Sequence, residues 1–511
     1  MTRRPSLPTI GLGVLVTGVL AIALVYAALT SAWASNRVRV SMIEFLEARF
    51  DADVAIEQIS IALVPRVSIE GRGLTLTHLE NAHGGPFIRL DRFSVAGWPL
   101  ELLRRRVSVV TVDGFALRVE RGSTRGGRSR GMDTHDVTID EVVVRNGLLV
   151  IVPNDPRKLP LRFELQEIAM SHFAFDRSSP YRAHLTNPKP RGSIDSTGQI
   201  GPWSTLDLRS TPLSGGYTFA DADLATIRGI GGTLTSTGRF EGVLERIRVR
   251  GVTSTPDFQL QLTGQPLNLD TRFEAMVDGT SGDTYLEEVD AMLGQSHILA
   301  KGSVVGEPGA KGRTVSLDVK VDNGRLDDFM RLAVKAVQPP MRGVIGFDTA
   351  FELPAGQGDV PQRLRLTGTF NIQRGQFTSD AVQDKVDQLS RRGRGEPKNE
   401  ALQDVMSTFG GAFTLRDGLL RLPRLQFRVS GAAVDLSGAY RLRGGDLGFA
   451  GTLKLDAPLS RTTTGFKSIL LKAVDPFFRK AAAGTVLPIK VGGTVEKPAF
   501  GLDIGKALTR K

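Results

Sequence analysis

Residues 363–372 read RLRLTGTFNI, and apolar and polar side chains alternate along this stretch. The apolar positions are Leu364, Leu366, Phe370 and Ile372, and the positions between them include Arg363, Arg365, Thr367, Thr369 and Asn371. Successive side chains of a β-strand point to opposite faces of a sheet, so alternation with a period of two is typical of a strand with one wet and one buried face. The stretch therefore predicts a half-buried β-strand.

The same alternation recurs between about residue 54 and residue 460, for example where Leu425, Phe427 and Val429 alternate with Gln426 and Arg428. Many of these runs are joined by an apolar residue, one or two polar residues and a Gly, as at 112–115, 144–148, 321–326, 372–377 and 415–419. Such polar-Gly pairs favour the positive φ angles of tight hairpin turns. We therefore expect a mainly β chain of serial antiparallel hairpins. A closed two-layer core and a single sheet with an open apolar face both satisfy this pattern.

The N-terminal region has no charged side chain from position 5 to position 36, and residues 10–29 are almost all Ile, Leu, Val, Ala and Gly. A helix of about 20 residues crosses the hydrocarbon core of a bilayer. The alternative is a cleaved secretory signal, because Ala32, Trp33 and Ala34 form an A-x-A pattern after Arg3 and Arg4. A signal peptide's apolar region usually runs only about 7 to 15 residues, so the length favours an anchor. Either segment sends the rest of the chain to the far side of a membrane.

Composition narrows the function classes. The 511 residues include no Cys, which excludes disulfides, thiolate nucleophiles and Cys-based metal sites. Lys and Arg number 65 against 54 Asp and Glu, a formal net charge of +11. These basic residues are dispersed, and only five Tyr and three Trp are available for stacking on bases, so nucleic acid is not an expected partner. An anionic membrane surface suits such charge better.

Short helices are expected in two places outside the strands. A helical spacing of apolar residues predicts an amphipathic helix just after the apolar segment, at Val38, Met42, Phe45, Leu46 and Phe50. Residues 380–389 predict a second helix, followed by a basic, Gly-rich run at 391–398. We interpret this run as a solvated loop, with contact to lipid headgroups as the alternative. Residues 122–130 form a second basic loop.

A wide apolar stripe with basic flanks lies near the C-terminus. The candidates for membrane contact in this stripe are Phe466, Ile469, Leu470, Phe477 and Phe478. An amphipathic segment of this kind lies on a membrane surface or caps the open end of a sheet, and Pro476 is expected to kink or divide it.

A search for catalytic motifs finds none. The six His residues form no H-E-x-x-H pair, and the chain has no phosphate-binding G-x-x-x-x-G-K-[ST] loop. The letters G-x-S-x-G occur at 127–131, within the basic Gly-rich loop, and not in the strand-to-helix context of a nucleophile elbow. Residues 278–284, DGTSGDT, lack the terminal Glu of an EF-hand and predict a hairpin turn rather than a calcium loop. We therefore expect no catalytic residue, no metal site and no cofactor.

The order of features resembles the AsmA-like family of envelope proteins over nearly the whole chain. The resemblance rests on the apolar N-terminal segment and on short pieces at 59–65, 86–88, 100–103, 229–234, 256–258, 277–280, 411–455, 474–477 and 488–494. The basic loops at 122–130 and 391–398 depart from the family's pattern.

The resemblance implies an elongated, antiparallel, bent sheet that forms an apolar groove, with an N-terminal transmembrane helix and a few short amphipathic helices. We expect a cytoplasmic tip and anchor at 1–36 and an N-terminal AsmA-like β region at 37–200. A middle β-groove region at 201–378 is followed by an AsmA-like C-terminal β region with a helical and basic insertion at 379–460. An amphipathic helix and terminal strands complete the chain at 461–511.

The family is associated with phospholipid movement between membranes and with outer-membrane integrity. The resemblance thus implies a single-pass inner-membrane protein with its bulk in the periplasm. Acyl chains are expected to lie against Leu364, Leu366, Phe370, Ile372, Leu425, Phe427 and Val429. Phospholipids and the inner membrane are the expected partners, together with the outer membrane or envelope proteins. Two alternatives stay open, an envelope assembly factor that binds proteins through sheet edges and a membrane-anchored hydrolase.

Overall fold

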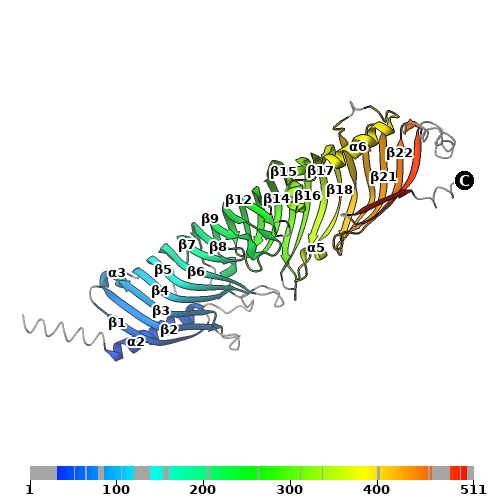
Figure 1. Ribbon diagram of the computed structural model, residues 1–511. Helices are drawn as coiled ribbons and strands as arrows, with labels where there is room; N and C mark the ends of the chain where they lie inside the picture. The colour runs from blue at the N-terminus through cyan, green and yellow to red at the C-terminus, as the bar shows by residue number, and fades with distance from the viewer. Residues whose placement is uncertain are drawn as a thin grey trace, which may run out of the picture. The chain divides into compact units, whose positions relative to one another are not determined.

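The structure of the protein is a computed structural model. It describes residues 31–502 apart from 51, 64–65, 79–85, 105, 120–137, 153–159, 204–207, 262, 264, 311, 336–337, 400–402, 459–460, 463–483 and 495–496. The described chain is mainly β, with few helices (Figure 1). It divides into unit 1, which comprises Met1–Ala220, Thr237–Val249 and Val277–Gly282, and unit 2, which comprises Asp221–Ser236, Arg250–Met276 and Asp283–Lys511.

Unit 1 begins with a helix and continues as a mixed sheet. Its elements are α2 (Ala32–Phe50), β1 (Ala52–Ala62), β2 (Val67–His78), β3 (Ile88–Gly97), α3 (Pro99–Leu103), β4 (Arg106–Val119), β5 (Thr138–Ile151), β6 (Leu161–Phe173), β7 (Ser179–Pro188), β8 (Arg191–Ile200) and η1 (Leu208–Ser210). Consecutive strands pair antiparallel except β4 and β5, which pair parallel.

Unit 2 contains a run of antiparallel strands in which each strand from β14 to β24 pairs with the next along the chain. Its elements are β14 (Asp283–Leu293), β15 (Ser296–Gly306), β16 (Arg313–Arg325), α4 (Leu326–Ala333), β17 (Met341–Leu353), α5 (Val360–Arg363), β18 (Arg365–Phe377), α6 (Asp380–Gly393), β19 (Ser407–Arg416), β20 (Leu419–Val429), β21 (Ala432–Arg441), β22 (Leu447–Leu455), β23 (Thr485–Gly493) and β24 (Pro498–Leu502).

The elements between these two groups are β9 (Pro212–Asp223), η2 (Leu224–Thr226), β10 (Ile230–Gly231), β11 (Thr233–Val243), β12 (Arg246–Leu260) and β13 (Leu267–Asp278). The residues of β9, β11, β12 and β13 are divided between the two units.

The helix expected after the N-terminal apolar segment is confirmed as α2. Val38, Met42 and Leu46 pack against the buried core of β1 to β4, where Val54 and Ile56 are almost fully enclosed. Phe45, by contrast, is exposed. The apolar side of α2 thus covers one face of the sheet in unit 1.

The expectation of a purely antiparallel sheet is wrong because of the β4–β5 pair. A parallel pair requires a crossover, since the chain must return to the end from which the first strand started. The connecting residues 120–137, which contain the basic loop at 122–130, lie outside the described residues.

Four of the five polar-Gly units are not hairpin turns. Only 415–419 turns the chain, with Arg416 paired to Leu419 across Asp417 and Gly418, whose φ angles of 52° and 69° fit a two-residue hairpin. The other four lie inside β4, β5, β16 and β18. The pairing register shifts at two of them, between Val321 and Gly324 and between Ile372 and Gly375. At the second shift, Arg374 has a φ of 51°, so this bulge uses the same kind of backbone conformation as a tight turn.

Within the described part of the chain, no helix combines the length and hydropathy that a transmembrane crossing requires. The expected span at 10–29 lies outside the described residues.

Candidate functional site

One face of the sheet in unit 2 carries apolar side chains in rows that cross the strands. Directly opposite residues of paired strands point to the same side of a sheet, so the pairing register defines each row. In strand order from β17 to β23, the middle row holds Phe347, Phe370, Gly411, Leu425, Leu436, Gly451 and Ile489. We call the side of the sheet that bears this row the apolar face of unit 2.

Two further rows flank the middle row on the same face. The helix-side row, next to α4 and α6, holds Ile345, Ile372, Phe409, Phe427, Val434, Leu453 and Leu487. The turn-side row, towards the hairpin at Asp417 and Gly418, holds Phe351, Leu366, Leu415, Leu420, Tyr440 and Leu447. The apolar face therefore continues across at least six consecutive strands without a charged side chain in these three rows.

The helix-side row is partly covered by the two short helices of unit 2. Leu326 of α4 is fully buried against Ile345 and Ile372, with Phe329 edge-on to Phe347 at 5.1 Å between ring centroids. Val386 of α6 packs in a separate cluster with Val429, Ala432 and Leu455. Each helix thus closes one part of the same margin of the sheet.

A buried polar network holds α6 in place. The Asp387 carboxylate accepts hydrogen bonds from the backbone N–H groups of Asp404 and Val405, both at 3.0 Å, and from Gln383 Nε2 at 2.9 Å. Ser390 Oγ donates to the backbone carbonyl of Ser430 at 2.7 Å. A buried carboxylate with several donors is satisfied without a counter-ion, so the network fixes the helix rather than forming a reactive site.

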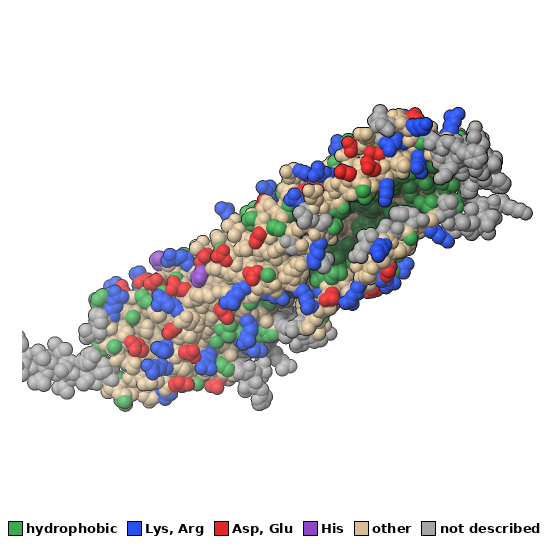
Figure 2. All heavy atoms as spheres, in the orientation of Figure 1, with side chains coloured by type: hydrophobic (Ala, Val, Ile, Leu, Met, Phe, Trp, Pro, Cys, Tyr) green, Lys and Arg blue, Asp and Glu red, His purple; other side chains and the backbone are tan. Residues whose placement is uncertain are grey.

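The middle row and the turn-side row remain largely open, although Leu415 of the turn-side row is buried. Phe370, Leu425, Leu436 and Ile489 are only half-buried. Among the described residues of β14 to β24, strands contact the strands they pair with, and no second sheet packs over the apolar face. Figure 2 shows a hollow lined by hydrophobic side chains in the region that Figure 1 labels β18, β21 and β22. An uncovered apolar surface of this kind marks a binding site or an interface.

The opposite side of the same strands is polar. Arg365 pairs with Glu352 at 2.9 Å, and Lys454 pairs with Asp435 at 2.7 Å. The hydrogen bond from Lys454 lowers the pKa of the Asp435 carboxyl, which also accepts a hydrogen bond from Gln426. The sheet in unit 2 therefore has one wet face and one apolar face.

The structure brings six of the seven predicted acyl-contact residues onto the apolar face. Leu366, Phe370 and Ile372 lie on β18, and Leu425, Phe427 and Val429 lie on β20. Leu364 follows α5 and precedes the strand, so the predicted strand begins at Arg365 instead.

Two of the six are enclosed rather than open, since Ile372 and Val429 are each only 8% exposed beneath the helix margin. The membrane-contact candidates Phe466, Ile469, Leu470, Phe477 and Phe478 lie outside the described residues.

The predicted acyl-contact set left out several residues of the open rows, namely Phe347, Leu420, Leu436 and Ile489. A weaker period-two signal was present, because Ile345, Phe347 and Phe351 are two or four residues apart, but Val344, Gly346 and Ala350 interrupt the alternation with polar residues. What the signal lacks is the strand register, which alone shows that these side chains form continuous rows.

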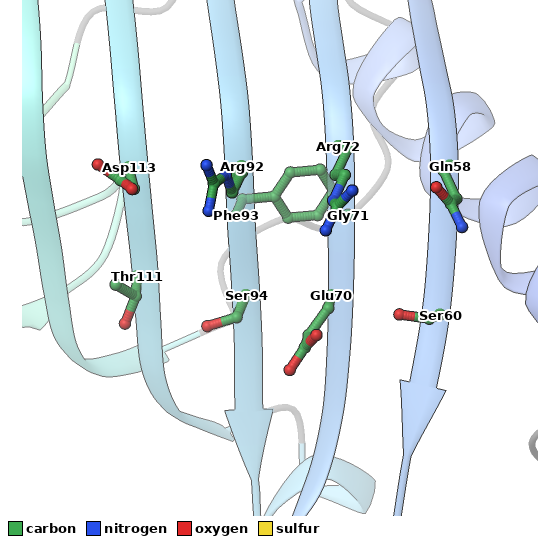
Figure 3. Close-up of a pocket in the computed structure, with 10 residues that line it drawn as sticks. All are labelled: Gln58, Ser60, Glu70, Gly71, Arg72, Arg92, Phe93, Ser94, Thr111 and Asp113. Carbon is green, nitrogen blue, oxygen red and sulfur yellow. The ribbon is translucent and has the colours of Figure 1, made fainter.

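A second, polar pocket of about 370 Å³ lies on β1 to β4 in unit 1 (Figure 3). Its lining includes Gln58, Glu70, Arg72, Arg92 and Asp113. Figure 3 shows the Phe93 ring lying over Gly71 within the same group of strands. Among the described residues, no group of three His, Cys, Asp or Glu side chains is placed to hold a metal ion.

Comparisons of the chain with family models, with curated proteins and with solved structures returned no match. The functional argument therefore rests on the geometry of the two faces.

Proposed function

We propose that the protein holds lipid acyl chains on the apolar face of unit 2 and serves phospholipid transport between membranes. The observation that carries the proposal is the open hollow bordered by the middle and turn-side rows (Figure 2). The apolar N-terminal segment and the resemblance to AsmA-like proteins support an inner-membrane anchor with the bulk of the chain in the periplasm. In this proposal the protein supports outer-membrane integrity by supplying lipid.

The continuous apolar rows favour a ligand that is long and apolar along its whole length, such as an acyl chain. Each row crosses the strands at about 4.8 Å per strand, and an acyl chain occupies one leaflet of a hydrocarbon core about 30 Å thick. One extended chain therefore covers about three strands of a row. Gly411 and Gly451 contribute no side chain to the middle row, so the surface is less raised at these two positions and a flexible chain can lie along the row.

The energetics favour passive movement. Each buried CH₂ group contributes about 0.8 kcal/mol, both in a bilayer and against an apolar protein surface. Transfer of an acyl chain from a membrane to the apolar face is therefore nearly balanced, while transfer into water is strongly unfavourable. The apolar face would lower the barrier between two membranes without itself setting the direction of movement.

The proposal is tested by extracting lipid from the purified full chain and quantifying it by mass spectrometry. Phe370→Asp places a charge in the middle row, whereas Thr369→Asp places the same charge on the polar face of the same strand. We expect at least a tenfold loss of bound lipid for Phe370→Asp and none for Thr369→Asp, because a charge in an acyl-contact surface costs more than one chain segment gains. Both variants must keep the far-ultraviolet circular dichroism of the wild type. A wild-type protein with no bound phospholipid would overturn the proposal.

A further inference from the structure

The polar face of unit 2 carries a concentration of exposed arginines that the apolar face does not explain. Arg416 ends β19, and Arg421, Arg424 and Arg428 follow on β20. In the register, Arg421 lies opposite Thr414, Arg424 opposite Ala412, and Arg428 opposite Thr408. All four therefore point to the side of the sheet away from Phe370 and Leu425. We call these four residues the arginine patch.

A β-bulge creates the patch. The register of β20 with β21 shifts between Leu422 and Leu425, which lie opposite Gly438 and Leu436. The extra residue in β20 lets Leu422 and Leu425 share the apolar face although they are three positions apart. It equally places Arg421 and Arg424 together on the polar face. Pro423 lies within the bulge, where its missing N–H costs no regular ladder hydrogen bond.

Carboxylates do not neutralise the patch. Other cations on this face are paired, for example Arg365 with Glu352 and Lys454 with Asp435. Asp446 faces Arg441, at 4.0 Å, and not the patch. The hydrogen bond from Lys454 is the main cause that lowers the pKa of Asp435, and the charge of Arg428 lowers this pKa by less. Asp417 lies at the hairpin turn next to Arg416, and Asp318 and Glu352 line the same shallow cavity as Arg416 without forming an ion pair with it. Among the described residues, none of the four arginines of the patch forms an ion pair.

Among the described residues, the cross-strand neighbours of Arg421, Arg424 and Arg428 in the patch have short side chains and no aromatic ring. Its cross-strand neighbours on the polar face of β19 and β21 are small, and include Ala412, Thr414, Ala433, Ser437 and Ala439. A shallow cavity of about 460 Å³ beside Arg421 is floored by Ala439 and Gly448. Guanidinium groups therefore project from a surface that a broad, flat partner can approach closely.

We propose that the arginine patch binds the phosphate groups of an anionic membrane surface. Basic residues near an anionic bilayer surface are attracted to its phosphate groups, and this attraction depends on ionic strength. A nucleic acid would present the same phosphates, but its recognition uses aromatic stacking or groove contacts that this face does not offer. The proposal goes beyond lipid binding by the apolar face, because it concerns the other side of the sheet.

The test uses the full chain held in phosphatidylcholine nanodiscs and measures capture of vesicles made of phosphatidylcholine alone or with phosphatidylglycerol. We expect capture only with phosphatidylglycerol, weakening as salt is raised. Each basic residue contributes a factor of about five, so Arg421→Gln/Arg424→Gln should weaken capture by about 25-fold. The matched control, Arg365→Gln/Lys320→Gln, removes the same charge from ion-paired residues of the same face and should weaken capture by less than threefold.

Two further arms separate this proposal from its alternatives. Arg421→Lys/Arg424→Lys should retain capture, since a bilayer surface accepts either cation, and Phe370→Asp should retain capture while losing acyl chains from the apolar face. Equal losses for the two Gln double variants would overturn the patch as a specific surface. Capture of duplex DNA without capture of phosphatidylglycerol vesicles would overturn the membrane as its partner.

Discussion

Gly71 shows how a single residue position is fixed by its cross-strand neighbour. It lies directly opposite Phe93, and a Cβ atom built at Gly71 would sit 2.0 Å from the Phe93 ring. The ring fills the space above the glycine (Figure 3) and is itself buried in the core of unit 1. Gly71 is therefore required by close approach rather than by its own backbone conformation.

We expect Gly71→Ala to lower the free energy of unfolding by about 1–3 kcal/mol, because the ring must move out of a packed position. The measurement is urea unfolding followed by circular dichroism. Gly216→Ala is the matched control, because a Cβ atom built at Gly216 would meet only the backbone carbonyl oxygen of Gly238, at 3.6 Å. Recovery of stability in Gly71→Ala/Phe93→Leu would confirm the ring as the cause, and an unchanged midpoint for Gly71→Ala would contradict it.

The alternating pattern predicted correctly which side chains share a face of a strand, whereas the polar-Gly units did not predict correctly where the chain turns. The alternating positions of β18 and β20 do lie on opposite faces of the sheet. The polar-Gly units at 321–326 and 372–377 carry the same signal as the true hairpin at 415–419 but form bulges. A local preference for positive φ cannot distinguish the two, because the difference depends on whether the chain continues beside the same partner strand.

At the scale of elements, α6 is the part of unit 2 whose role is most readily tested. Val386 is buried against Val429, Ala432 and Leu455, whereas Val382 on the same helix is 39% exposed. We expect Val386→Asp to destabilise the docked helix by about 3 kcal/mol, because a charge replaces a packed aliphatic side chain. Hydrogen exchange of the α6 amides should then accelerate by about 100-fold.

Val382→Asp supplies the control, with the same substitution four residues earlier on the solvent side. Its α6 amides should exchange within about threefold of the wild type. If both variants opened the helix equally, the covering role assigned to α6 would be incorrect.

The helices α2 and α6 were predicted from the sequence, whereas α3, α4, α5 and the strand partners were not. The predicted helix at 380–389 is confirmed as α6, which extends to Gly393, because a helix is specified by residues close together in the chain. The parallel pairing of β4 and β5 depends instead on where a crossover returns the chain. The basic run at 391–398 is also more integrated than a solvated loop, since Gly393 is buried against Gly431 and Ala432.

At the scale of the molecule, the sequence left two arrangements open for the alternating strands. A closed two-layer core and an open sheet use the same apolar residues. In the described part of unit 2, the strands form one layer, and α4 and α6 cover only its helix side. This choice could not be predicted from period-two alternation, because Phe347, Phe370 and Leu436 become a continuous surface only through the register of their strands.

In the proposed function, acyl chains occupy the open rows of the apolar face. Neighbouring positions on β21 provide the most direct test, because Leu436 points into the middle row and Ser437 points to the polar face. A benzophenone-bearing amino acid is placed at either position in the full chain carrying Arg421→Gln/Arg424→Gln, so that membrane capture by the arginine patch does not label position 437. Cells are irradiated, and cross-linked products are identified by mass spectrometry. We predict lipid adducts at position 436 and none at position 437. Equal lipid labelling at both positions, or protein adducts alone at position 436, would contradict the claim.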